Sequence, residues 1–127
     1  MNITQNQLDA IVASVLAVNK YGIEKAYAIL PALRKAGLLD CESVAKEPIR
    51  KVMIRLAETG YDRGLLTEMM AGRLVDLMKA VSARQLDPLP ALIARGDRVN
   101  ATELLCSIKG IGPSVARDVW MLLQQDL

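Results

Sequence analysis

A Gly-Ile-Gly-Pro-Ser segment near the end of the chain has the residue types that most clearly imply chemistry. Gly110 can end a helix by adopting a positive φ at no cost from a Cβ, and Gly112 lets another molecule approach the backbone closely. Pro113 suits the first position of a helix, where no N–H is needed. The next amides, from Ser114 and Val115, then have no intrahelical partner and lie at the positive end of the helix dipole. We therefore expect this segment to bind phosphate.

Two apolar runs must form the helices that position this segment. One run ends at Ile108 and the other follows Pro113, which predicts two helices joined by a tight turn over residues 101–125. Ile111 is expected to fill the gap between these helices, and Lys109 places a cation beside the turn. The alternative is a glycine-rich helical corner that binds nothing.

The spacing of an apolar residue, any residue, Gly, an apolar residue and Gly over residues 108–112 resembles the helix-hairpin-helix motif of DNA-repair proteins. The order of the preceding helices resembles the helical half-barrel of endonuclease III-like DNA glycosylases. This resemblance implies that the protein binds the phosphate backbone of duplex DNA through one lysine and four main-chain amides: Lys109, Gly110, Gly112, Ser114 and Val115. It also implies a monovalent cation on the main-chain carbonyls of Cys106, Ile108 and Ile111. Hairpins of this shape also mediate protein–protein contacts, so a protein-interaction module or inhibitor is the second hypothesis.

Glycosylase chemistry is not expected from the chain alone. The resemblance places the nucleophilic lysine of lyase-type members at Ser114, although monofunctional members use water instead. The essential aspartate of the family lies beyond the second hairpin helix, and that helix is expected to continue to Leu127, the last residue of the sequence. Asp118 and Asp126 are expected to be solvated helix charges. A working glycosylase, the third hypothesis, needs a catalytic aspartate from a partner chain.

The charge distribution gives the DNA hypothesis limited support. The net charge is +2, and residues 96–127 carry three cations against four anions. Strong non-specific DNA binding normally uses a clustered basic face. The one modestly basic region, residues 46–84, has eight cations against five anions. It extends a DNA footprint if it folds to the same side as the hairpin, and is otherwise a solvated face; its cations include Arg50, Lys51, Arg55, Arg63, Arg73, Lys79 and Arg84.

Composition bounds the remaining function classes. Two cysteines and no histidine exclude a zinc or iron–sulfur cluster, so we expect no cofactor beyond the monovalent cation. With no signal peptide and no membrane-length apolar run, the protein is expected to be cytoplasmic. Its 52% hydrophobic residues predict an apolar flank covered by a partner protein or by a second copy, and a homodimer would place two hairpins on one duplex.

No segment alternates with the period of a strand, so residues 1–127 are predicted to form one all-α domain, a compact bundle of about seven or eight short helices. Thr4 and Gln7 predict a capping box for a first helix that runs to about Asn19. Either Asn100 or Thr102 is expected to cap the first hairpin helix after a turn at residues 96–99. The other helices are expected at about 23–36, 41–45, 48–58, 64–81 and 89–94, and Trp120 is expected in the core.

Overall fold

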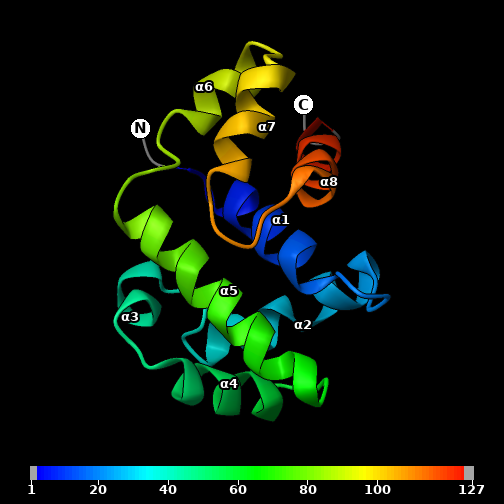
Figure 1. Ribbon diagram of the computed structural model, residues 1–127, viewed down its shortest axis with the longest axis vertical. Helices are drawn as coiled ribbons and strands as arrows, with labels where there is room; N and C mark the ends of the chain where they lie inside the picture. Colours follow the sequence, from blue (N-terminus) through cyan, green and yellow to red (C-terminus); the bar gives the residue numbers. More distant parts are fainter. Residues whose placement is uncertain (1–2, 125–127) are drawn as a thin grey trace.

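Eight helices and no strand make up residues 3–124, the part of the chain that the computed structural model describes (Figure 1). The all-α prediction is therefore confirmed. The helices are α1 (Gln5–Leu16), α2 (Ile23–Lys35), α3 (Cys41–Ala45), α4 (Ile49–Glu58), α5 (Leu65–Ser82), α6 (Leu89–Ala94), α7 (Arg98–Cys106) and α8 (Pro113–Gln124).

Helix α1 is the centre of the core. The predicted capping box fixes its start: the Gln7 amide donates to Thr4 Oγ1 at 3.1 Å, and the Thr4 amide donates to Gln7 Oε1 at 2.9 Å. From Leu8 to Leu16 every residue except Asp9 is buried. A helix that is buried on nearly all sides must be enclosed by others, and α2, α5 and α8 pack around it. The buried side chains form one continuous cluster.

Helix α1 ends at Leu16, earlier than the predicted Asn19, because contacts from distant residues bend the chain there. Asn19 and Lys20 have φ values of 60° and 71°, which an α-helix does not allow. The Arg63 guanidinium donates to the main-chain carbonyls of Val18 and Asn19, each at 2.6 Å. These bonds satisfy two carbonyls just beyond the end of α1 that have no partner within the helix.

Local signals fix the ends of the next helices. Gly37 has a φ of 78° after α2, with the Leu38 amide bonded to the Leu33 carbonyl, as in a Schellman motif. Asp40 caps α3 by accepting from the Ser43 amide at 3.3 Å. The long helix α5 then packs against α1, α3 and α4 and joins the two halves of the molecule.

The prediction for the start of the hairpin was wrong. The cap is Asp97, whose side chain accepts from the Asn100 side chain at 2.8 Å and from the Asn100 amide at 3.3 Å. These bonds lower the pKa of Asp97 below its ordinary value. Helix α7 therefore begins at Arg98 within the predicted turn, and the Thr102 hydroxyl donates to the Arg98 carbonyl instead of capping. Residue 125, the predicted end of the hairpin, lies outside the described residues.

Trp120 is half-buried and packs against the core from α8, so it is less enclosed than predicted. Among residues 3–124, no helix combines the length and the apolar character that crossing a membrane requires.

Candidate nucleic-acid interface

The hairpin, defined here as α7, the turn at residues 107–112 and α8, has the predicted tight connection. Gly110 has a φ of 94°, the left-handed conformation that favours glycine. The Ile111 amide donates to the Ile108 carbonyl at 3.1 Å and closes the turn. The Gly112 carbonyl accepts from the Ala116 amide at 3.0 Å and so starts α8.

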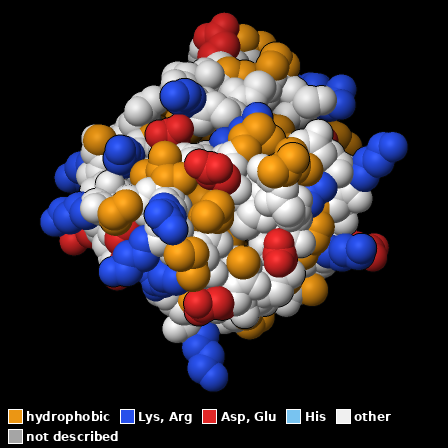
Figure 2. All heavy atoms as spheres, turned by 60° about the horizontal axis from the view of Figure 1, so that its bottom comes forward, with side chains coloured by type: hydrophobic (Ala, Val, Ile, Leu, Met, Phe, Trp, Pro, Cys, Tyr) orange, Lys and Arg blue, Asp and Glu red, His pale blue; other side chains and the backbone are white. Residues whose placement is uncertain are grey.

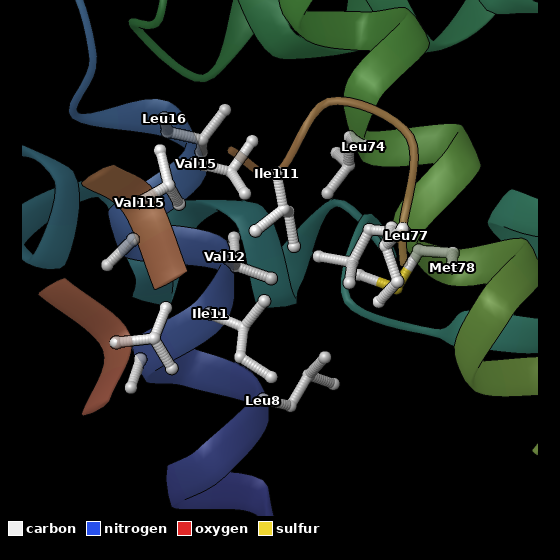
Figure 3. Packing of buried hydrophobic residues seen from close by; sticks show 14 of the residues in the cluster. Leu8, Ile11, Val12, Val15, Leu16, Leu74, Leu77, Met78, Ile111 and Val115 are labelled. Atoms are coloured by element: carbon white, nitrogen blue, oxygen red, sulfur yellow. The ribbon is translucent and has the colours of Figure 1, made fainter. Parts of the chain in front are cut away.

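Ile111 anchors this turn to the core. Its side chain is only 5% exposed and points between α1 and α5, beside Val12 and Val15 on one side and Leu74 and Leu77 on the other (Figure 3). Ile111 therefore fills a gap between two earlier helices, α1 and α5, whereas the sequence pointed to the gap between the hairpin helices. This anchor fixes the position of the flanking backbone.

The four amides proposed to bind phosphate make no hydrogen bond within the described part of the chain: those of Gly110, Gly112, Ser114 and Val115. The last two belong to the first turn of a twelve-residue helix, where the dipole favours an anion. A Cβ added at Gly112 would meet no atom within 4 Å, so the space that a side chain at this position would occupy is open. The Ser114 side chain is exposed, whereas the Val115 side chain is buried in the core.

Arg73 of α5 lies directly against the turn. A Cβ added at Gly110 would lie 2.9 Å from Arg73 Cγ and 3.3 Å from Arg73 Cδ, so the aliphatic part of the arginine packs on the glycine backbone. The Arg73 guanidinium forms no ion pair within residues 3–124. Sequence reasoning placed Arg73 in a basic region but had no signal that joined it to Gly110, because the two residues are far apart in the chain.

Other unpaired cations border the turn on two sides. Exposed Lys109 and Lys79 line one shallow hollow, together with Asp76, where the Gln85 side chain donates to Ser107 Oγ at 2.9 Å. A second hollow lies between α7 and α8, and its lining includes Arg98, Glu103, Cys106, Ser114 and Arg117. The amides of the turn are thus surrounded by more cations than anions.

The predicted basic region does not act as one surface. Arg55 donates to both carboxylate oxygens of Glu47 at 2.9 Å, and Arg84 pairs with Asp87 at 2.6 Å. Arg63 is bonded to the carbonyls at the end of α1, as described above. Arg73 and Lys79 are therefore the members of this region that lie beside the turn, while Arg50 and Lys51 lie on α4.

The carbonyls assigned to a monovalent cation differ in their bonding. The Ile108 carbonyl accepts the hydrogen bond that closes the turn, whereas the carbonyls of Cys106 and Ile111 accept none from the described residues. Within the same part of the chain, no three His, Cys, Asp or Glu side chains gather as a metal site.

Asp118 and Asp126 are the two carboxylates that the sequence predicts to be solvated helix charges. Asp118 is exposed on α8 and lines a hollow with Ser14, Ile23 and Met121. Asp126 lies outside the described residues.

Comparisons of the chain with protein families, with curated proteins and with solved structures found no match.

Proposed function

We propose that this protein binds duplex DNA without reading its sequence, by contacts of the hairpin with backbone phosphates. The observation that carries the proposal is the unbonded set of amides at Gly110, Gly112, Ser114 and Val115, with the Arg73 stem packed on the same turn. The likeness of residues 108–112 to the helix-hairpin-helix motif of DNA-repair proteins supports it. The order of the earlier helices resembles the half-barrel of the DNA glycosylases, so we infer that a glycosylase-like fold is used here to bind DNA without catalysis.

The amides and the cations have separate roles in this proposal. The amides at the start of α8 and the helix dipole hold one phosphate in place, and they carry no sequence information. Arg73 and Lys109, together with Lys79, Arg98 and Arg117, attract the neighbouring phosphates. If about three phosphates are neutralised, the logarithm of the binding constant falls with the logarithm of salt concentration with a slope of about −3. The low net charge of +2 agrees with such a small footprint.

The test is a duplex titration at low and at moderate salt, read by fluorescence anisotropy, with the native chain and Gly112→Glu. The glutamate side chain fits without a clash, because a Cβ at Gly112 meets no atom within 4 Å. Its carboxylate then occupies the position proposed for the phosphate. The matched control is Ala28→Glu, which makes the same charge change at an exposed position of α2. We expect salt-sensitive binding by the native chain and the control, and none by Gly112→Glu, with helicity unchanged in all three. A native chain that binds no duplex at low salt contradicts the proposal.

Binding of another protein is the second candidate function. Exposed apolar side chains favour it, at the end of the molecule opposite α6 and α7 (Figure 1). Ile49 and Ile54 of α4 are 44% and 48% exposed, and Leu65 at the start of α5 is 98% exposed. Such groups commonly mark contact surfaces. Loss of DNA binding on Gly112→Glu with no effect on a protein complex would show that the two activities use different surfaces.

A further inference from the structure

The outward face of α4 carries an apolar side chain between two charged ones. Arg50, Ile54 and Glu58 follow one another at intervals of four residues, so they lie along one side of the helix. All three are exposed, and neither Arg50 nor Glu58 forms an ion pair within residues 3–124. An apolar side chain is thus flanked, one turn away on each side, by free charges of opposite sign.

An apolar groove lies beside this face. It has a volume of about 470 Å³ and is lined by residues of α4, of the loop that follows it and of the start of α5: Met53, Ile54, Ala57, Glu58, Asp62, Gly64 and Thr67. Figure 2 turns this end of the molecule toward the reader and shows hydrophobic side chains interspersed with both cationic and anionic ones. The surface therefore offers apolar contact together with charges of both signs.

We propose that this face binds a second copy of the chain, with the two α4 helices antiparallel across a twofold axis at Ile54. Each Arg50 then faces the Glu58 of the other copy, because both residues lie four positions, or about 6 Å along the helix, from the axis. Each Ile54 packs into the groove of the other copy beside Met53 and Ala57. A partner of a single charge would leave one end of the face opposed by like charge, whereas a second copy satisfies both ends.

The pairing leaves the hairpin helix α7 uncovered. Helix α4 lies at the opposite end of the molecule from α6 and α7 (Figure 1). The dimer would carry two hairpins, but the proposal of a dimer does not depend on what the hairpin binds.

The test is the oligomeric state, measured by sedimentation velocity at protein concentrations between about 1 and 100 μM. The monomer–dimer equilibrium of a modest interface falls within this range. The native chain is expected to dimerise in this range. Arg50→Glu or Glu58→Arg alone puts like charges together twice in the dimer and should weaken it about tenfold or more. The double variant Arg50→Glu/Glu58→Arg restores both pairs with their signs exchanged and should dimerise like the native chain.

Two matched variants, each with an exposed apolar residue replaced by glutamate, show whether a loss of dimerisation is specific to the outward face of α4. Ile54→Glu should be monomeric, whereas Val99→Glu should dimerise normally, because Val99 is 67% exposed on α7 at the other end of the molecule. Far-ultraviolet circular dichroism checks that every variant is folded. A native chain that stays monomeric over the whole concentration range overturns the proposal. Single charge reversals that dimerise like the native chain, or a folded double variant that stays monomeric, overturn it as well.

Discussion

The Tyr61 hydroxyl donates a buried 2.7 Å hydrogen bond to the main-chain carbonyl of Leu16, 45 residues earlier in the chain. The bond joins the loop between α4 and α5 to the end of the central helix α1. Arg63 reinforces it from the same loop, with its guanidinium 5.2 Å from the centre of the Tyr21 ring and 5.8 Å from that of Tyr61. This cluster connects the α4–α5 part of the molecule to the core that carries the hairpin.

Tyr61→Phe is expected to destabilise the protein, because it keeps the ring and leaves the buried Leu16 carbonyl without its donor. The expected loss in the free energy of unfolding is about 1–3 kcal/mol, measured by urea denaturation. Tyr21→Phe is the control, since the Tyr21 ring is half-buried and its hydroxyl makes no hydrogen bond within the described residues. Its effect should stay within about 0.5 kcal/mol. Equal losses in the two variants would show that the Tyr61 bond contributes nothing specific.

The same tyrosine is expected to make the protein sensitive to alkaline pH. Burial raises the pKa of Tyr61 above its ordinary value of 10.0, although the Arg63 hydrogen bond partly opposes this. The folded state therefore holds the hydroxyl proton more tightly than the unfolded chain does. The protonated Tyr61 hydroxyl therefore stabilises the folded state. This stabilisation is fully present below about pH 10 and is lost as pH rises through the raised pKa of Tyr61.

Urea denaturation between about pH 9 and pH 11 tests this expectation. The free energy of unfolding should fall more steeply with pH in the native chain than in Tyr61→Phe. Parallel curves for the two proteins would assign the alkaline sensitivity to other groups, such as Cys41, whose pKa is also raised by burial.

The two glycines of the turn should differ in their tolerance of alanine. Gly110→Ala requires a positive φ and places a Cβ 2.9 Å from Arg73 Cγ, so a loss of about 1–2 kcal/mol is expected. Gly112→Ala enters open space and should change the free energy of unfolding by less than about 0.5 kcal/mol. Thermal unfolding of the two variants measures the difference. A similar loss in both variants would contradict the difference in backbone conformation and free space between the two glycines.

Ser14→Ala is expected to stabilise the protein. The serine lies in α1, is 3% exposed, and its buried hydroxyl has no hydrogen-bond partner in the described residues. Alanine removes this unsatisfied group and is the better helix former, so a gain of about 0.5–1 kcal/mol is expected in urea denaturation. A loss of stability instead would show that the hydroxyl is bonded in solution. Ala10→Ser, which adds a hydroxyl at another buried position of α1, is the reverse control and should be destabilising.

The features that the sequence predicts well depend on residues only a few positions apart. Thr4 and Gln7 form their capping box within one turn of helix, and the predicted end of the second helix at about residue 36 is set by the backbone conformation of the next residue, Gly37. The contacts that the sequence did not reveal join distant residues, such as Arg73 with Gly110 and Arg63 with the carbonyl of Val18. The cap of α7 was missed for a different reason. Asp97, Asn100 and Thr102 can all cap a helix, and nothing local decides between them.

The position of Ile111 in the core has a consequence for how the turn behaves in isolation. A peptide or a graft that carries only α7, the turn and α8 would expose this isoleucine to water and lose the support of α1 and α5. In the intact protein, large movements of the turn would require Ile111 to leave its site, so the free amides beside it are held in one arrangement before any ligand arrives. A rigid, preorganised turn of this kind loses little entropy on binding.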